Sequence, residues 1–319
     1  MLPSLPPALA ATLDARARGL SRTDAAKRQA IISQTYRAGG GSIDIKTEAD
    51  ALAYALARMP ATYAAVVACL NALTEIVSDF APTSLLDCGA GPGTATWAAT
   101  QAFNSLHDVT LLDSNPALRA LALALSDETT RPLRYHLGDI FAMLSTANAA
   151  DLVTASYMIG EVPDPKRAAL ADALWKKTRD TLLVVEPGTP AGYARIIALR
   201  ARLIAQGAHV IAPCPHDDVC PLTSPDWCHF VQRLPRSRAH MALKSAEVPF
   251  EDEKFSYVAL SRAKPDRRPS RVLAQPDVTK IAVTAKLCTP AGLEIATAPK
   301  RDGEAYRRFK KLDWGDGVD

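Results

Sequence analysis

Four cysteines in the second half of the chain could together bind a metal centre: Cys214, Cys220, Cys228 and Cys288. The first three fall within 15 positions of an irregular, proline-rich segment that carries few apolar residues. Such a segment cannot form a core of its own, and bonds from thiolates to a metal would supply the missing stability. The cysteine pattern therefore predicts a metal site that also ties the later Cys288 to this segment.

The spacing of the cysteines leaves the identity of the metal open. Five and seven residues separate the first three cysteines, which is wider than the C-x2-C pairs usual for zinc. His216 or His229 could still complete a zinc tetrahedron. A disulfide framework is not expected, because the sequence shows no secretion signal and a reducing compartment keeps thiols free. Four unrelated buried thiols are the remaining alternative.

A second group of residues could bind a nucleotide-like cofactor. Residues 87–93 read Asp-Cys-Gly-Ala-Gly-Pro-Gly and lie between a short apolar run and a helical pattern. Glycines at such a turn let the backbone approach a ligand and point amide N–H groups at it. Two later carboxylates follow the next apolar runs, where they could contact a ribose and an adenine amino group. The candidate cofactor residues are Asp87, Gly89, Gly91, Gly93, Asp113 and Asp139.

The glycine pattern distinguishes between two classes of cofactor. A dinucleotide site of the Rossmann type has the pattern G-x-G-x-x-G, but Thr94 and Ala95 follow the third glycine here. The loop instead resembles motif I of class I S-adenosylmethionine-dependent methyltransferases, and the acidic positions match the cofactor pattern of that family. The sequence thus favours S-adenosylmethionine over NAD.

No known motif identifies a catalytic group. Residues 156–163 follow the fourth apolar run and lack the Pro-Pro-aromatic box of enzymes that methylate exocyclic amines. Tyr157 and Glu161 are candidates for contact with a substrate, although a tyrosine at a strand end more often serves packing. Cys214 stands between two prolines, which resembles the Pro-Cys pair of carbon-5 cytosine methyltransferases. It falls after the fifth run rather than the fourth, which argues against that role.

Alternating strands and helices are expected to position these residues. Ala-rich segments at 48–58 and 61–80, separated by Pro60, predict an N-terminal helical cap. Short apolar runs then alternate with helical patterns, which indicates βαβ units and a parallel sheet. The runs are 84–87, 109–113, 134–137, 152–156 and 182–186. We predict an α/β fold, a Rossmann-like class I methyltransferase sheet with a cysteine-bearing insertion and a small C-terminal β extension.

Four regions follow from this pattern. Residues 1–80 form the N-terminal helical region and residues 81–212 the methyltransferase-like core that binds S-adenosylmethionine. Residues 213–230 form the cysteine-rich metal loop, and residues 231–319 form a basic β extension. The extension is expected from β-like runs, split by prolines, at 255–260, 271–274, 281–287 and 293–296.

The charge distribution singles out the last region. The net charge is only +3, but residues 1–230 contain 19 Lys and Arg against 22 Asp and Glu, whereas residues 231–319 contain 18 against 12. Clustered cations beside a β extension suit the phosphates of folded RNA, and Tyr306, Phe309 and Trp314 could stack on bases. The cations are Arg233, Arg236, Arg238, Arg262, Lys264, Arg267, Arg268, Arg271, Lys300, Arg301, Arg307, Arg308, Lys310 and Lys311.

Composition and the N-terminal residues bear on the compartment. The chain is 48% hydrophobic, as a packed core requires, and no apolar run reaches the roughly 20 residues of a membrane span. Asp14 and the early prolines argue against a mitochondrial import helix. We therefore expect a bacterial-type cytoplasmic protein rather than a mitochondrial one, with no membrane partner and monomeric when free.

Several of these segments together resemble one known family: residues 87–93, 156–163, 185–188, 214–220, 226–230 and 255–257. They resemble the methyltransferase-like family of small-ribosomal-subunit proteins, known from mitochondria and with bacterial relatives, over nearly the whole chain. The resemblance implies a class I methyltransferase fold, a role in small-subunit assembly and a 4Fe-4S cluster. By this resemblance the four cysteines match the cluster ligands, and Cys288 is the ligand whose spacing varies.

The main functional hypothesis is a small-subunit maturation factor that binds S-adenosylmethionine, an iron-sulfur cluster and rRNA on the small ribosomal subunit. Whether the protein methylates rRNA is left open. The absence of the Pro-Pro-aromatic box favours a protein that binds rRNA without methylating it. The alternative is a small-molecule or protein methyltransferase with a structural zinc site. That alternative predicts no affinity for RNA.

Overall fold

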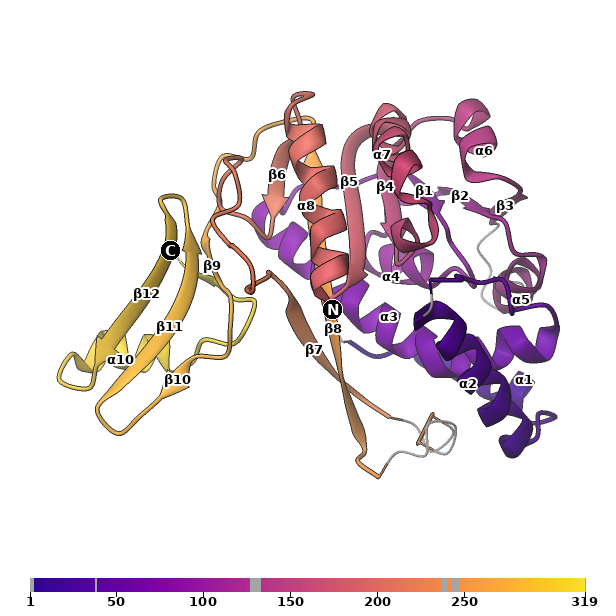
Figure 1. Cartoon of the computed structure of the whole chain (residues 1–319), viewed down its shortest axis with the longest axis horizontal. Helices are drawn as coiled ribbons and strands as arrows, with labels where there is room; N and C mark the ends of the chain where they lie inside the picture. Colours follow the sequence, from indigo (N-terminus) through magenta and orange to yellow (C-terminus); the bar gives the residue numbers. More distant parts are fainter. Residues whose placement is uncertain (1–2, 38, 127–132, 237–239, 242–246, 319) are drawn as a thin grey trace.

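The main body of the protein is a sheet of eight strands whose connections are mostly helices (Figure 1). The computed structural model describes residues 3–37, 39–126, 133–236, 240–241 and 247–318. Seven strands follow the order β3-β2-β1-β4-β5-β8-β6, and β7 pairs with β8. The strands are β1 (Ser84–Cys88), β2 (Asp108–Asp113), β3 (Arg134–Leu137), β4 (Ala150–Ser156), β5 (Thr178–Pro187), β6 (His209–Ala212), β7 (Phe230–Pro235) and β8 (Phe250–Ser261).

The direction of the strands identifies the fold class. Strands β1 to β5 pair in parallel, whereas β8 runs antiparallel to β5, β6 and β7. The chain reverses its order between β1 and β4, which is the switch point where open α/β sheets bind ligands. The predicted Rossmann-like class I methyltransferase fold is confirmed, and so are the five apolar runs predicted as parallel strands.

Helices cover both faces of this sheet. Neighbouring strand residues alternate between two cores: Leu85 and Leu111 pack on one face, and Leu86 and Leu112 on the other. Such two-sided burial is why the parallel strands read as continuous apolar runs. The first face is covered by α1 (Pro7–Ala17), α2 (Arg22–Arg37), α3 (Glu48–Ile76), α4 (Thr94–Ala102) and α5 (Pro116–Ser126), and the second by α6 (Ile140–Thr146), α7 (Asp164–Lys177) and α8 (Pro190–Ile204).

Helix α3 differs from the sequence prediction. It begins at a capping box between Thr47 and Asp50 and continues through Pro60, so that the two segments predicted on either side of this proline are one helix. A proline in a helix removes one backbone hydrogen bond. The flanking Met59 and Ala61 are almost fully buried in the protein core, and this packing outweighs the local cost.

Helix α3 is also more apolar than the sequence analysis predicted, since no apolar run was expected to be long enough to span a membrane. By length and composition α3 could cross one, with a mean hydropathy of 1.3 in its most apolar window. Inside the protein 67% of that window is buried, and α3 packs against α2, α4, α5 and strands β7 and β8. Its composition is therefore explained by its place as a core helix.

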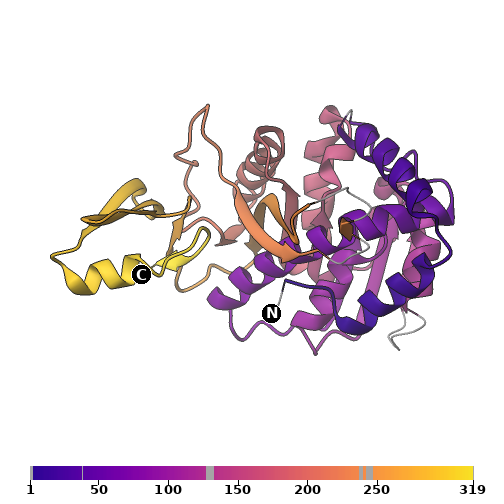
Figure 2. The same ribbon diagram turned by 90° about the horizontal axis from the view of Figure 1, so that it is seen from below.

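The C-terminal extension begins later than predicted. The prediction counted β7 from residue 231 onward and all of β8 as part of the extension, but both strands belong to the main sheet, because alternate residues of β8 such as Val258 and Leu260 complete its core. The extension is a separate sheet of β9 (Ser270–Val272), β10 (Asp277–Val278), β11 (Ala282–Thr289), β12 (Gly292–Pro299) and β13 (Gly317–Val318), with helix α10 (Gly303–Phe309) packed on it. Figures 1 and 2 show this sheet at the opposite end of the molecule from α1 and α2.

Candidate functional site

The glycine loop lies between β1 and α4, at the switch point of the sheet. Gly89 and Gly93 have φ angles of +67° and +80°, a region that favours glycine. A side chain at Gly89 would also meet Met158, since its Cβ would stand 2.5 Å from the Met158 Cβ. The loop is therefore fixed both by its own backbone and by the segment that follows β4.

Asp87 braces this loop from inside the protein. Its Oδ2 accepts hydrogen bonds from the Thr96 N–H at 3.1 Å and the Thr96 hydroxyl at 2.7 Å, and its Oδ1 accepts one from the Thr154 hydroxyl at 2.7 Å. The carboxyl is fully buried, and this burial raises its pKa to about 6. Asp87 therefore links β1, β4 and α4 at the base of the loop.

The two other acidic candidates stand at the ends of neighbouring strands. Asp113 accepts hydrogen bonds from the Gly91 N–H at 2.8 Å and the Asn115 N–H at 2.7 Å, and burial raises its pKa. Asp139 caps the N-terminus of α6 and is exposed, with Oδ1 accepting two backbone N–H groups at 3.0 Å. Both carboxylates thus hold the backbone around one hollow.

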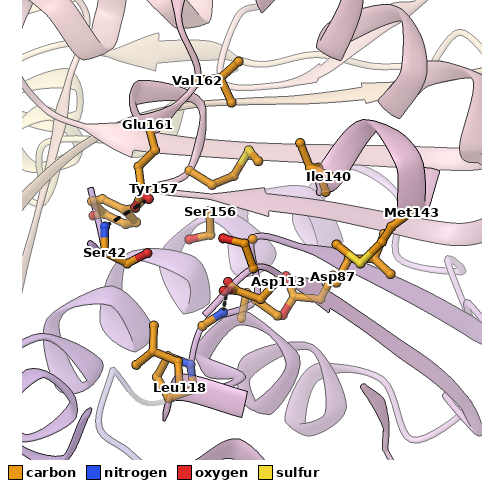
Figure 3. A pocket seen from close by; sticks show the side chains of 18 of the residues that line it. Ser42, Asp87, Asp113, Leu118, Ile140, Met143, Ser156, Tyr157, Glu161 and Val162 are labelled. Atoms are coloured by element: carbon orange, nitrogen blue, oxygen red, sulfur yellow. Dashed lines mark hydrogen bonds between the residues drawn. The ribbon is translucent and has the colours of Figure 1, made fainter. Parts of the chain in front are cut away.

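A cavity of about 270 Å³ lies over these strand ends (Figure 3). Five of the six predicted cofactor residues line it, and Gly93 lies behind it beside Trp97 and Leu111. Tyr36 of α2 and Tyr54 of α3 also line the cavity, although no sequence motif predicted them. The five lining residues from the predicted set are Asp87, Gly89, Gly91, Asp113 and Asp139.

The two catalytic candidates lie together on one side of this cavity, beside Ser42 (Figure 3). Tyr157 has a positive φ of +57°, which is uncommon outside glycine, and its hydroxyl donates to Glu253 at 2.9 Å. Glu161 accepts a hydrogen bond from the Ser42 N–H at 3.2 Å. Glu161 as a residue is exposed, yet its carboxyl is packed among neighbouring groups, and this burial raises its pKa to about 7.

The four predicted metal ligands line a different cavity, between α8 and the small sheet. Cys214, Cys220 and Cys228 come from the loop before β7, and Cys288 comes from β11. All four are free thiols, of which Cys288 is buried and the other three partly exposed. The fold therefore places Cys288 in the same cavity as Cys214, which is 74 positions earlier in the chain. Cys69 and Cys88 do not line this cavity.

Charged and polar groups surround this cysteine cavity. Arg200 and Arg271 line it and are almost fully buried, and the Arg200 Nε has no hydrogen-bond partner. His216 approaches Cys288, with Nε2 3.7 Å from Sγ. Burial, with smaller contributions from neighbouring cysteines, raises the pKa of Cys214 and raises that of Cys288 to about 12. As free thiols these groups are protonated at neutral pH.

The described part of the chain contains no group of three or more His, Cys, Asp or Glu side chains arranged to hold a single metal ion. His229, the second histidine considered for zinc, instead stacks on Trp227, with ring centroids 5.0 Å apart. The four cysteines predicted to bind a metal thus line one cavity, and the metal itself remains a prediction.

Several residues predicted for RNA contact are engaged inside the protein instead. Arg271 is only 2% exposed, and the Arg262 guanidinium lies 3.8 Å from the centroid of the Trp175 ring. Phe309 is buried in the core of the small sheet, and Trp314 packs edge-on against His229. Arg238 lies outside the described residues. The exposed cations of the set include Lys300, Arg301, Arg307, Arg308, Lys310 and Lys311.

Comparison with known proteins places these features in context. A family model described as mitochondrial small ribosomal subunit Rsm22 matches residues 48–319. The ribosome assembly protein METTL17, mitochondrial, from Homo sapiens is 31% identical over 293 residues, which cover 85% of this chain and 62% of that protein. The mitochondrial Rsm22-cox11 tandem protein 2 of Schizosaccharomyces pombe is 26% identical over 331 residues, with coverages of 85% and 43%. The chain thus spans less than two thirds of these relatives.

Two solved structures illustrate the structural likeness. Magnesium protoporphyrin IX methyltransferase (ChlM) from Synechocystis PCC 6803, with bound SAM, has a TM-score of 0.42 at 11% identity and covers 74% of this chain and 97% of its own. Precorrin-6y C5,15-methyltransferase from Geobacter metallireducens GS-15 has a TM-score of 0.40 at 11% identity, with coverages of 60% and 84%.

The expected bacterial-type cytoplasmic location is wrong. The three curated relatives that match are all named as mitochondrial proteins, which points to mitochondria. The prediction depended on the composition of the first 20 residues. These residues include α1, whose Leu9 and Leu13 pack into the protein core, so their composition reflects packing and does not report the compartment.

Proposed function

Because the chain belongs to the family of the mitochondrial small ribosomal subunit protein Rsm22, we propose that it is an assembly factor of the mitochondrial small ribosomal subunit. In this role it binds S-adenosylmethionine in the cavity at the switch point, an iron-sulfur cluster at the four cysteines, and rRNA through the basic extension. One observation carries the proposal: thiols from the loop before β7 and from β11 line a single cavity that joins the main sheet to the extension.

The residues around the switch-point cavity fit the methyl donor. The glycine loop lines the cavity at the carboxyl ends of the strands, held there because the Gly89 and Ala90 N–H groups donate to the Leu112 carbonyl, and an exposed Asp139 stands beside the third strand. Asp113 would hold the ribose, because it ends β2 next to the loop. Ile140, Phe141 and Met143 supply an apolar wall for an adenine ring. When bound, the donor supplies an electrophilic methyl group.

The cysteine cavity fits a 4Fe-4S cluster. In such a cluster each of four thiolates binds its own iron, so the ligands surround the cavity rather than converge on one point. Cys214, Cys220, Cys228 and Cys288 all line this one cavity, which supports the proposal. The buried guanidinium groups of Arg200 and Arg271 would balance the negative charge that four thiolates bring. When bound, the cluster supplies the covalent links that a loop of low apolar content lacks.

The cluster would fix the position of the small sheet. Cys288 lies in β11, two contacts join the small sheet to the cysteine loop, and a third joins this loop to the main sheet. The Lys286 ammonium pairs with Asp226 in the cysteine loop. Arg271 of β9 donates to the Pro213 carbonyl at 3.4 Å, and the Cys228 carbonyl accepts from the Ser256 hydroxyl of β8 at 2.8 Å. Loss of the cluster would therefore loosen the basic surface that is proposed to bind rRNA.

The test combines metal analysis with ribosome binding. Protein purified without oxygen is analysed for visible absorption, iron, sulfide and zinc, and is then sedimented with small ribosomal subunits at increasing salt. We expect four irons and four sulfides per chain, and cosedimentation that weakens as salt rises. One zinc without colour, or no cosedimentation at low salt, would overturn the proposal and favour a small-molecule or protein methyltransferase.

A further inference from the structure

A second cavity of about 510 Å³ adjoins the switch-point cavity. The two share five residues in their walls, and α2, α3, the end of β5, the start of α8 and nearby glycines line the rest of the second cavity. A volume of this size is within the range of small-molecule sites. The shared residues are Tyr36, Tyr54, Thr62, Tyr157 and Glu161.

Aromatic rings dominate the shared wall. Tyr36 and Tyr54 stack with their ring centroids 5.8 Å apart and their planes at 19°. Tyr157 reaches the same wall from the strained turn after β4, where a positive φ directs its ring between the cavities. Strained residues of this kind cluster at ligand sites, because the surrounding structure must hold them in place. The wall therefore suits the flat face of an unsaturated ring.

Apart from Glu161, the charged side chains that line the second cavity are in ion pairs, and the partner of Arg58 lies outside the lining. The Arg58 guanidinium binds both oxygens of Glu253, at 2.9 and 3.3 Å. Arg195 binds the fully buried Glu186 at 2.6 Å. These pairs shape the cavity and leave their charges largely compensated.

Glu161 differs from these paired groups. Burial acts most strongly on the Glu161 carboxyl, followed by the Ser42 N–H, Asp113, the Tyr36 hydroxyl and Glu186, and none of these four groups is a cation. Tyr54 of α3 also faces it. Gly41 presses close, since a Cβ on this glycine would lie 2.4 Å from the Glu161 Oε2. The loop before α3 thus holds an accessible carboxyl at the junction of the two cavities.

We propose that the second cavity is the methyl-acceptor site, and that it takes one planar RNA base whose proton-bearing nitrogen faces Glu161. This inference rests on the proposed function, because it needs the methyl donor in the first cavity. Flipped bases are commonly held between aromatic side chains and read by hydrogen bonds at their edges. The stacked tyrosines and Glu161 offer both kinds of contact.

In the methyl transfer, Glu161 acts as the general base. The lone pair of the base nitrogen forms a bond to the donor methyl carbon, and the bond from that carbon to sulfur breaks with its electron pair left on sulfur. The nitrogen's proton passes to the Glu161 carboxylate, which later releases it to water. The surroundings raise the pKa of Glu161 to about 7, and this value suits a general base at neutral pH. Glu161 as a carboxylate base would take the place of the Pro-Pro-aromatic box, which the chain lacks.

The test uses two variants and one matched control. Ala191→Phe fills the second cavity from the exposed start of α8, whereas Ala194→Phe adds the same ring on the same helix at an exposed position outside the cavity. Glu161→Gln keeps the shape of the junction but cannot accept the proton. Binding of S-adenosylhomocysteine, of small ribosomal subunits, and of the probes cytidine and adenosine is measured for each protein. Transfer of labelled methyl to small subunits from cells lacking this protein is followed from pH 5 to 9.

The expected results separate the acceptor site from the proposed function. Ala191→Phe should abolish binding of the nucleoside probes and methyl transfer, while Ala194→Phe behaves as the unchanged protein. Glu161→Gln should bind the probes within about twofold, but transfer methyl at least about 100-fold more slowly and without the inflection near neutral pH. All variants should keep S-adenosylhomocysteine and subunit binding. If those two are kept but no nucleoside binds, or no methyl is transferred by the unchanged protein, the acceptor site is overturned while the assembly role stands.

Discussion

The Asp87 carboxylate and the Thr154 hydroxyl form a buried hydrogen bond of 2.7 Å that joins β1 to β4 under the glycine loop. The second oxygen of Asp87 is occupied by the N–H and the hydroxyl of Thr96. A residue predicted to bind the cofactor is therefore first a structural link between three elements. Loss of ligand binding in an Asp87 variant would not by itself report contact with a ligand.

Replacing Asp87 by alanine should destabilise the protein even without any ligand. The change leaves one buried N–H and two buried hydroxyls without their acceptor, which costs about 3 kcal/mol or more of the free energy of unfolding. Asp139→Ala is the matched control, because it removes an exposed N-cap carboxylate worth about 1 kcal/mol. Urea unfolding of both variants measures the difference. Equal destabilisation would contradict the structural role of Asp87.

The pH dependence of stability gives a second view of the same carboxyl. Burial raises the pKa of Asp87 to about 6, above the value of about 3.9 in an unfolded chain. The folded state therefore holds this proton more tightly, and its contribution to stability is full below pH 4 and is lost as the pH rises through about 6. Between pH 4 and 7 the free energy of unfolding of the unchanged protein should fall by up to about 3 kcal/mol more than that of the Asp87→Asn variant. Urea unfolding of both proteins at each pH tests this, and parallel curves would contradict it.

The cysteines can be tested one at a time. Cys220→Ser should remove the visible absorption of anaerobically purified protein and lower its iron content, because one ligand of the proposed cluster is lost. Cys69→Ala is the control, since Cys69 is fully buried in α3 and away from the cysteine cavity. Alanine is preferred there, because a buried serine hydroxyl without a partner costs about 1 to 3 kcal/mol. Equal iron loss in both variants would argue against Cys220 as a ligand.

The elements that local sequence determines were predictable. Each parallel strand is a short apolar run buried on both faces, and the glycine loop between β1 and α4 needs conformations that glycine supplies. The candidate cofactor residues follow from these elements, because strand ends of a parallel sheet meet at one edge. Five of the six line one cavity for this reason.

The features that depend on distant contacts could not be predicted. Pro60 ends no helix, because burial of α3 on both sides of it outweighs its local preference. Strand β8 enters the main sheet by pairing with β5, about 70 residues earlier in the chain. Tyr36 and Tyr54 reach the site from helices that carry no motif, and Arg271 is buried by contacts of β9 and β13 that its basic neighbours did not indicate.

The basic surface of the extension should show a measurable salt dependence. Arg307, Lys310 and Lys311 are exposed on and just after α10, and their joint replacement by glutamine removes three positive charges without touching the buried Phe309. The slope of log binding constant against log salt for small-subunit RNA should then fall by about 0.7 to 0.9 for each phosphate contact removed.

A matched triple variant separates this local effect from the change in net charge. Lys27, Lys46 and Lys176 are exposed on the main body, and their replacement by glutamine removes the same charge far from the extension in sequence. Its salt slope should stay near that of the unchanged protein, because these side chains are not expected to contact phosphates. If both triple variants lower the slope equally, the extension has no special part in RNA binding, and the attraction is due to net charge alone.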